Sequence, residues 1–451
     1  MNSNVPDFVH DTHWHSIAAD VRPNVQLAAK NALLDLLGVA ASGTSTRLSA
    51  IVRDHALDNF AARARPGYEG CRIMFDGRRC SAPGAALAGG MQIDSVDAHD
   101  GYKPTKGHIG CGVLPAALAL CEMEEDVNEA ELMSKLIIGY EIGARAGIAL
   151  HASVPDYHTS GAWIALACAA IGARSLSLSS EQTREAMGIA EYHGPRSQMM
   201  RCIDHPTMLK DGSGWGAMAG VSASLLAQQG FTGAPALTVE SDAVQSIWAD
   251  LGSRWTILEQ YIKAYPVCRW AQPAIAAVLK LHQQHDFCHS DVKRLEIGTF
   301  HESARLAVRR PQNTEQAQYS LPFPTGAAVV HNDVPLSSID GDGLQDEHVL
   351  RISELVELVE VEQYNNVFPE QRISHVNIEL HDGSVLESGA TEAAGDPEHP
   401  FSADEIEAKF MRFAAPVLTE FGAIALADEV RAIGEKPSLS TLNALIYKAV
   451  K

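Results

Sequence analysis

The stretch of the chain richest in chemically active side chains runs from residue 94 to 114 and reads DSVDAHDGYKPTKGHIGCGVL. Glycines and a proline interrupt it, so we predict a non-helical loop between a small-residue helix at 83–91 and an apolar helix that begins at Pro115. Loops held between rigid elements often carry catalytic groups, whereas the alternative is a surface crossover with solvated charges. The loop's acids, imidazoles and ammonium groups are Asp94, Asp97, Asp100, His99, His108, Lys103 and Lys106.

Two later loops also place polar groups between helical patterns. Residues 151–161 contain His158, and residues 196–216 contain Lys210. An imidazole titrates near neutral pH, and burial can lower the pKa of a lysine enough for it to act as a base. The candidates for general acid–base chemistry are therefore His108, His158 and Lys210, with Asp97 beside them. For each of them the alternative is a hydrogen-bonded structural residue.

The charge balance indicates what kind of partner the chain binds. Lys and Arg number 35 and Asp and Glu 56, so the formal charge is −21, which argues against nucleic acid and anionic membranes. If the substrate is anionic, it must be attracted locally, by a few Lys and Arg gathered against the field of the whole chain. Arginine suits a carboxylate because its planar fork can donate two hydrogen bonds. The candidate anchors are Lys103, Lys106, Lys210 and Arg269.

Other chemistries match the sequence less well. GSGWG at 212–216 follows no predicted strand and lacks the spacing of a phosphate-binding loop. The spacing of Asp97, His99 and Asp100 fits no standard metal site, and no serine or cysteine elbow is recognisable. Eight scattered cysteines without CxxC pairs, no secretory signal pattern and no apolar run of about 18 residues predict a reduced, cytoplasmic protein without a membrane span.

Hydrophobic periodicity divides the chain into two units. Helical patterns dominate up to residue 262, and N-cap signatures begin two of them at Asn128 and Ser179. From 263 the pattern changes: 292–300 alternates like a strand, and Asp382-Gly383 predicts a hairpin. Between these strands, 316–331 and 345–361 read as helices.

We therefore predict a mostly α protein with a large helical domain and a smaller α+β lid. A capping box at Ser402 and Glu405 restarts helix near the C-terminus, and these last helices are expected to return to the first domain. The predicted boundaries are 1–262 together with 400–451 for the helical domain and 263–399 for the lid.

Three segments together resemble the MmgE/PrpD family, which includes 2-methylcitrate dehydratase, cis-aconitate decarboxylase and iminodisuccinate epimerase. They are DAHDGYKPTKGHIGCGVLPAALAL, MLKDGSGWGAMAG with the later FTGAPALTVE, and KAYPVCRWAQPAI followed by AQYSLPFPTGAAVV. The resemblance extends over most of the chain. It implies a helical domain with an α+β lid, a homodimer and no cofactor.

The same resemblance carries functional residues onto this chain. The family's acid-rich loop falls on Asp97 and Asp100, and its other polar positions fall on His108, His158 and Lys210. Two positions differ from the pattern of the decarboxylases: Gln272 stands where they carry a histidine, and Phe323 where they carry a tyrosine. The expected substrate-binding residues are Asp100, Lys103, Lys106, Arg269 and Gln272.

Losing an imidazole and a phenol removes two proton donors, which favours the epimerase branch over the lyases. In the resulting hypothesis His108 and Lys210 move protons next to a carboxylate, His158 can replace either, and Asp97 orients His108. Arg269 and Lys103 would hold carboxylates. The alternatives are a dehydratase or decarboxylase, and a non-catalytic helical binding protein. Every version requires His108 and Lys210 to meet at one site beneath the lid.

Overall fold

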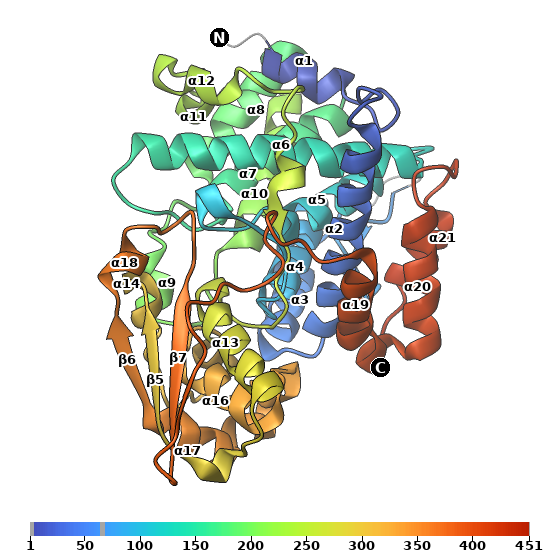
Figure 1. Ribbon diagram of the computed structural model, residues 1–451. Helices are drawn as coiled ribbons and strands as arrows, with labels where there is room; N and C mark the ends of the chain where they lie inside the picture. The colour runs from blue at the N-terminus through green and yellow to red at the C-terminus, as the bar shows by residue number, and fades with distance from the viewer. Residues whose placement is uncertain (1–3, 64–67, 451) are drawn as a thin grey trace.

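The computed structural model describes residues 4–63 and 68–450 and shows a mostly α protein with one four-stranded sheet among them (Figure 1). Long helices pack into a large domain, and the sheet lies in a smaller α+β domain beside it. The predicted fold class is confirmed. The central helices are α2 (Arg22–Gly43), α4 (Ala82–Asp94), α5 (Gly110–Cys121), α6 (Glu129–Ser153), α7 (Gly161–Ser175) and α10 (Ser213–Gln228).

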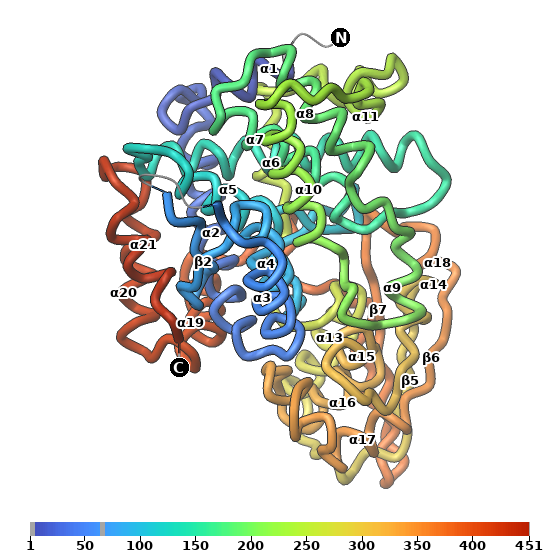
Figure 2. Tube along the Cα trace, turned by 180° about the vertical axis from the view of Figure 1, so that it is seen from behind, coloured from blue at the N-terminus to red at the C-terminus, as the bar shows by residue number. Residues whose placement is uncertain are grey.

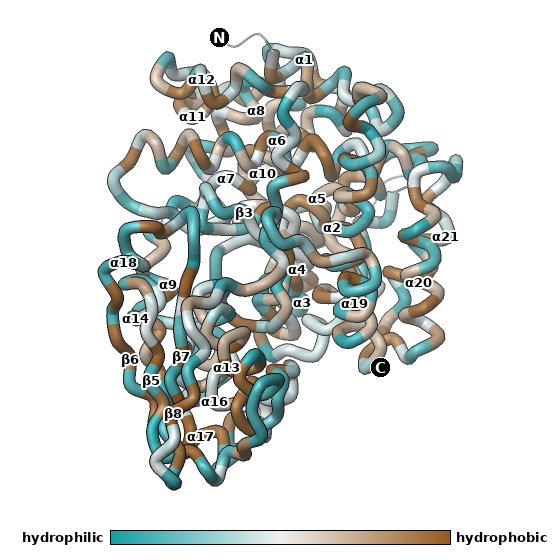
Figure 3. The backbone as a smooth tube through the Cα atoms, viewed as in Figure 1, coloured by the Kyte–Doolittle hydropathy of each residue, from teal (hydrophilic) through white to brown (hydrophobic). Residues whose placement is uncertain are grey.

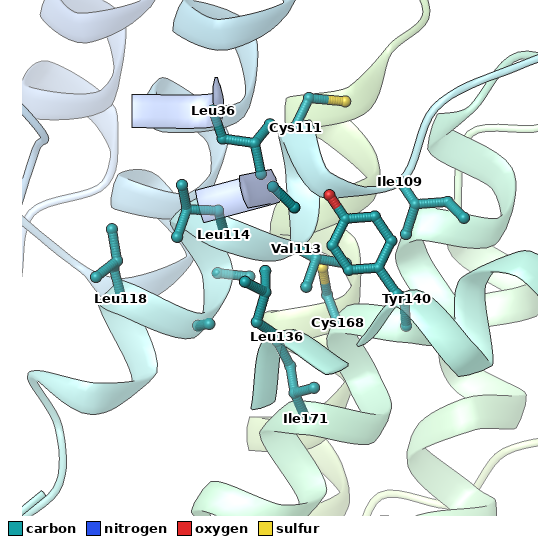
Figure 4. Close-up of a cluster of buried hydrophobic side chains, with 14 of the residues drawn as sticks. Leu36, Ile109, Cys111, Val113, Leu114, Leu118, Leu136, Tyr140, Cys168 and Ile171 are labelled. Atoms are coloured by element: carbon teal, nitrogen blue, oxygen red, sulfur yellow. The ribbon is translucent and has the colours of Figure 1, made fainter. Parts of the chain in front are cut away.

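Helix α5 is the centre of the large domain, and every one of its residues is buried. Its apolar side chains meet Leu36 of α2, Tyr140 of α6 and Ile171 of α7 (Figure 4). The prediction that this helix begins at Pro115 is wrong, because the helix already begins at Gly110. A Cβ at Gly110 would lie 2.1 Å from the Tyr140 hydroxyl, so glycine is required there by close packing rather than by a turn.

Shorter elements surround these central helices. The predicted N-caps are confirmed: Asn128 accepts a hydrogen bond from the Glu131 amide, and Ser179 forms a capping box with Gln182. The peripheral elements are α1 (Asn4–Asp11), α3 (Arg47–Asn59), α8 (Ser180–His193), α9 (Met200–Asp204), α11 (Leu237–Glu240), α12 (Gln245–Trp248), and the short strands β1 (Cys71–Arg72) and β2 (Arg79–Cys80).

The smaller domain is built on a sheet of strand order β6-β5-β7-β8. Strand β5 pairs parallel with β6 and antiparallel with β7, and the predicted hairpin joins β7 to β8. The strands are β5 (Val292–Thr299), β6 (Val356–Glu360), β7 (Ser374–Leu380) and β8 (Val385–Glu387), and the helices beside them are α13 (Gln272–Gln284), α14 (His301–Ala304), α15 (Thr314–Gln318), α16 (Pro322–His331), α17 (Glu347–Leu355) and α18 (Glu362–Asn365).

Two helix predictions in this domain are partly wrong. The helix predicted over 345–361 ends at Leu355, and residues 356–360 form β6, because their alternating VELVE pattern pairs with β5. The helix predicted over 316–331 is interrupted before Pro322, because a proline in its first turn suits the start of a new helix rather than the interior of an old one.

The C-terminal helices α19 (Ala403–Leu418), α20 (Glu420–Ala432) and α21 (Ser440–Ile446) lie beside the large domain (Figure 2). Phe410 of α19 packs against Gly38 of α2, where a Cβ would come within 2.9 Å of the ring. A buried ion pair of Lys409 with Asp35, 2.5 Å long, joins the same two helices. One hydrophobic core accordingly combines residues from 5–257 with residues from 406–447.

A second core lies within the α+β domain and uses residues from 267–378 together with Met199, Cys202 and Ile203. Polar and apolar residues are interspersed along α20 (Figure 3), and its buried apolar residues belong to the first core. Among the described residues, no helix combines the length and the apolar character that crossing a membrane requires.

Close contact between α7 and α10 gives the first testable prediction. A Cβ at Gly220 would lie 2.3 Å from the Ala165 carbonyl oxygen, so Gly220→Ala should lower the free energy of unfolding by about 1–3 kcal/mol. At Gly422 of α20 the nearest atom is 3.4 Å away, so Gly422→Ala should instead raise stability by up to about 1 kcal/mol through helix propensity. Urea denaturation checks both, and equal effects would contradict the packing explanation.

Candidate active site

The charged loop between α4 and α5 is folded into the protein. Strand β3 (Gly101–Tyr102) pairs with β4 (Gln260–Tyr261), and a 3-10 turn spans Lys103–Thr105. Burial excludes the alternative of a surface crossover with solvated charges. The buried carboxyl and imidazole groups of residues 94–114 are those of Asp94, Asp97, His99, Asp100 and His108.

His108 is oriented by three contacts. Its Nδ1 lies 2.6 Å from the carbonyl oxygen of Asp100, so Nδ1 carries the proton and donates it there. Its amide donates to Ser160 Oγ, and its Nε2 lies 3.5 Å from Asp211 Oδ2. Burial, assisted by the charge of Lys263, lowers the pKa of His108 to about 4. The imidazole is therefore neutral near pH 7, with Nε2 free to accept a proton.

Asp97 was expected to orient His108, but its carboxylate is engaged with Lys263. The Lys263 ammonium lies 2.7 Å from Asp97 Oδ1 and also donates to the Asp97 carbonyl. Burial alone would raise the pKa of Asp97, yet Lys263 and Lys210 hold that pKa below its usual value. Orientation of His108 comes from Asp100 and Asp211 instead, because their oxygens are the ones near its ring nitrogens.

Lys210 reaches the same site from the loop before α10. The residue is 2% exposed, has a backbone φ of +50°, and its ammonium hydrogen-bonds Gln318 Oε1. A left-handed conformation is unfavourable for lysine, and such strain is common at functional sites. Asp211, the next residue, accepts a hydrogen bond from Ser160 Oγ and faces His108. His108 and Lys210 both lie close enough to Asp97 for their charges to lower the pKa of its carboxylate, so the structure brings the two residues to one cluster.

Two further buried groups, Asp94 and His99, lie next to His108 and Asp211. Burial, with the added charge of Asp211, raises the pKa of Asp94 to about 7. His99 lies between Asp94, at 3.9 Å, and the ring of His108, whose centroid is 4.3 Å from its own. Burial and the neighbouring cations lower the pKa of His99 well below its usual value. The sequence drew attention to this loop, but Asp94 and His99 were not among its candidate catalytic groups.

Tyr319 supplies a phenol that the sequence analysis missed. Lys210 Nζ lies 4.5 Å from the centre of the Tyr319 ring, and burial together with Asp97 raises the pKa of its hydroxyl. Phe323, the position expected to have lost this phenol, is buried in the core of the α+β domain. The signal was available in AQYS, four residues earlier than the position that was compared.

Three of the expected substrate-binding residues are engaged within the protein. Lys103 pairs with Glu398 at 2.8 Å, and Arg269 pairs with Asp396 at 2.9 Å while also donating to the carbonyls of Ala393 and Ala394. Gln272 accepts from the Ala264 amide and donates to backbone carbonyls of the same junction. Lys103 therefore ties the charged loop to the lid, and Arg269 and Gln272 hold the lid's own segments together.

Lys106 and His158 form a neighbouring group. The Lys106 ammonium lies 4.0 Å from the centre of the Tyr157 ring, and the His158 amide donates to His151 Nε2. Burial lowers the pKa of His158. Within the described part of the chain, His158 makes no hydrogen bond or ion pair with His108 or Lys210, so the structure does not bring it to the central cluster.

Asp97, His99 and His108 are also close enough together to be considered as ligands of a metal ion. Ligand atoms of Asp97, His99 and His108 lie within 4.8 Å of one another. A metal ion there would have to displace the Lys263 ammonium from Asp97 and would be repelled by Lys210.

Comparison with known proteins places this site in a family. Residues 4–250 match the MmgE/PrpD N-terminal domain and residues 265–432 the MmgE/PrpD C-terminal domain, so the chain belongs to the MmgE/PrpD family. It is an enzyme of that family, an isomerase or a lyase, rather than the binding protein that the sequence left open.

The curated relatives are named as decarboxylases. Cis-aconitate decarboxylase-like protein oryM of Aspergillus oryzae is 22% identical, with 95% of this chain and 94% of the relative covered. Cis-aconitate decarboxylase of Aspergillus terreus is 22% identical, with 97% of this chain and 95% of the relative covered. Cis-aconitate decarboxylase of Homo sapiens is 23% identical, with 93% of this chain and 89% of the relative covered. The chain thus resembles these proteins over nearly its full length.

The raised pKa of Asp94 predicts a pH-dependent stability. A carboxyl group with an unfolded pKa near 3.8 and a folded pKa of about 7 stabilises the fold below pH 4, and this contribution is lost as the pH rises through 7. Asp94→Asn should therefore stabilise the protein increasingly between pH 4 and 8, by about 2–4 kcal/mol relative to wild type. Urea denaturation at several pH values measures the difference.

The exposed Asp58 provides a matched control for this prediction. Asp58→Asn removes the same charge from the surface and should show no such trend. If Asp94→Asn changes stability equally at pH 5 and pH 8, the buried carboxyl does not titrate as described.

Proposed function

We propose that the protein is a lyase that acts on a small di- or tricarboxylate, most closely as a decarboxylase of the cis-aconitate type. One observation carries the proposal: the Tyr319 ring lies 4.5 Å from Lys210 Nζ, near the carboxylates of Asp97 and Asp211. This phenol removes the reason for preferring the epimerase, namely the supposed loss of a proton donor. The names of the relatives support the same reaction class.

The electrostatics of the site suit a reaction in which negative charge develops on a carbon next to a carboxylate. The ammonium groups of Lys210 and Lys263 are both buried, where an attractive charge is screened less than in water. His108 is neutral near pH 7, so the positive charge near it comes from the two lysines. Cations fixed before the reaction begins need no reorganisation during it.

In a decarboxylation, the bond between the carbon skeleton and the leaving carboxylate breaks, and carbon dioxide departs. The electron pair stays on the skeleton, delocalised into a remaining unsaturated or carboxylate group, and a proton from Lys210 or Tyr319 then reaches the carbon. The donor regains a proton from solvent through the neighbouring polar groups. No electron acceptor is needed, because the substrate carboxylate plus one proton has the same atoms and electrons as carbon dioxide plus the protonated product.

Epimerisation is the second candidate, and a different observation favours it. His108 and Lys210 are both buried and both lie near Asp97, so two proton-transfer groups are available to remove and return a proton. Dehydration would use the same groups, with one proton removed from carbon and another given to the departing hydroxide. The fate of the substrate, rather than the identity of the residues, separates these reactions.

Substitution at the two central bases tests the proposal. Lys210→Ala and His108→Gln should each lower kcat about 10²–10⁴-fold, because Lys210 is a proposed proton donor and His108 is one of the neighbouring polar groups through which the donor regains its proton. Lys293→Ala on the exposed face of β5 is the matched control and should be fully active. Turnover is followed by proton spectra in heavy water with a panel of di- and tricarboxylates that includes cis-aconitate.

The products in that assay discriminate the reaction classes. Release of carbon dioxide supports the decarboxylase, whereas an olefin formed with loss of water supports the dehydratase. Deuterium entering an α carbon with loss of optical purity would instead establish the epimerase. Near wild-type turnover in both folded variants would remove His108 and Lys210 from the mechanism.

A homodimer is also proposed, because exposed apolar side chains flank the Lys210 loop and α10. Leu209 is 70% exposed, Trp215 44% and Leu226 41%, and such side chains gathered on one element are typical of an interface.

Light scattering tests the oligomeric state. The wild-type protein should have twice the chain mass of 48.5 kDa, and Trp215→Glu should shift it toward a single chain, because a charge is costly to bury in an apolar contact. Phe421→Glu on α20 is the control, since Phe421 is 87% exposed and lies on another element. A single-chain mass for the wild type would contradict the dimer.

A further inference from the structure

Arg372, which precedes β7 in the lid, is buried without an anionic partner. The residue is 2% exposed, and its Nε and both terminal nitrogens lack hydrogen-bond partners. Among the described residues no carboxylate lies within 4 Å of this guanidinium. Burying an unpaired charge is strongly unfavourable, so a buried guanidinium that keeps five donors free indicates an anion that binds there.

The surroundings of Arg372 are aromatic and cationic. Its guanidinium carbon lies 4.9 Å from the centre of the Tyr261 ring, and that of Arg269 lies 5.0 Å from the same ring. Arg269 already pairs with Asp396, whereas Arg372 has no such partner. The ring therefore fixes the position of Arg372 without neutralising it.

Lys106 adds a second cation from the other domain. It lies close enough to Arg372 that this charge, after burial, lowers the pKa of the lysine. Glu302 and Glu370 attract Lys106, but among the described residues no carboxylate is within 4 Å of its ammonium. A buried and a half-buried cation that repel each other are stabilised when an anion lies between them.

The position of this pair relates it to the central cluster and to solvent. Tyr261 is two residues before Lys263, the partner of Asp97, so Arg372 lies next to the strand that leads into the active site. Nearby, a cavity of about 340 Å³ opens between Lys103 and Pro104 on one side and Pro369 and Glu370 on the other, and Glu259 and Glu398 also line it.

We propose that Arg372 and Lys106 form the receptor for a second carboxylate of the substrate, distinct from the one held beside Lys210 and Lys263. The assignment rests on the proposed function for the chemistry at the reacting end. Arginine's planar fork can hold a carboxylate through two hydrogen bonds, and the lysine adds a third charge-assisted contact. The receptor selects acids with at least two carboxylates.

The receptor also joins the two domains, because Arg372 belongs to the lid and Lys106 to the helical domain. A carboxylate bound between them replaces repulsion across the seam by attraction. Binding of a dicarboxylate should therefore stabilise the whole protein, whereas a monocarboxylate cannot reach both the receptor and the central lysines.

Succinate serves as a probe that needs no turnover. In isothermal titration calorimetry and thermal unfolding, succinate should bind the wild-type protein and raise its Tm, while acetate at equal ionic strength should not. Arg372→Met should weaken succinate binding about tenfold or more and raise the Tm of the ligand-free protein, since it removes an unpaired buried charge. Arg372→Lys should retain part of the affinity.

Matched measurements separate this inference from the proposed reaction. Arg310→Met on the lid surface is the control, because Arg310 forms an exposed pair with Glu354 and should bind succinate as the wild type does. With an active substrate, Arg372→Met should raise KM more than it lowers kcat. Unchanged succinate affinity and unchanged KM in Arg372→Met would overturn the receptor while leaving the lyase proposal standing. Arg372-dependent succinate binding without any turnover would support the receptor and count against the lyase.

Discussion

The buried ion pair between Asp97 and Lys263 is the interaction on which the site depends. Its partners come from the charged loop and from the junction that leads into the lid, 166 residues apart, and both are almost completely buried. Removing one partner of such a pair leaves an uncompensated charge, which costs about 3–5 kcal/mol. The pair therefore fixes the loop that carries His108 to the start of the domain that covers it.

Burial gives the neighbouring groups protonation states that they would not have in water. The imidazole of His108 stays neutral, the carboxyl of Asp94 titrates near pH 7, and the phenol of Tyr319 keeps its proton. Positive charge is concentrated on lysines in a chain whose net charge is −21. The local positive charge of these lysines opposes the field of the whole molecule.

The position of one phenol changes the choice between reaction classes. Comparing single positions suggested that this chain lacks a proton donor, because Phe323 was taken as the relevant residue. In the fold, α15 ends immediately before Tyr319 and turns its ring toward Lys210, while Phe323 enters the lid core. A donor beside the lysine is compatible with the lyases that the chain resembles, so the epimerase no longer has priority.

The sequence by itself determined the family, the mostly helical class, the capped helix starts, and the loop that contains Asp97 and His108. These features depend on local patterns, such as helical periodicity and side chains that cap the nearest amides, which can be recognised in a short window. Pairing of β6 with β5 was missed for the same reason, because its partner lies about 60 residues away.

Only the tertiary structure decided which side chains meet. Lys103, Arg269 and Gln272 have the right chemistry for substrate binding, but segments from elsewhere in the chain already occupy their polar groups. Lys263 and Tyr319 lie in segments that resemble the family, but nothing local shows what their side chains contact, and Arg372 carries no motif at all. Their importance comes from burial and from distant partners, or from the lack of one, and these properties exist only once the chain is folded.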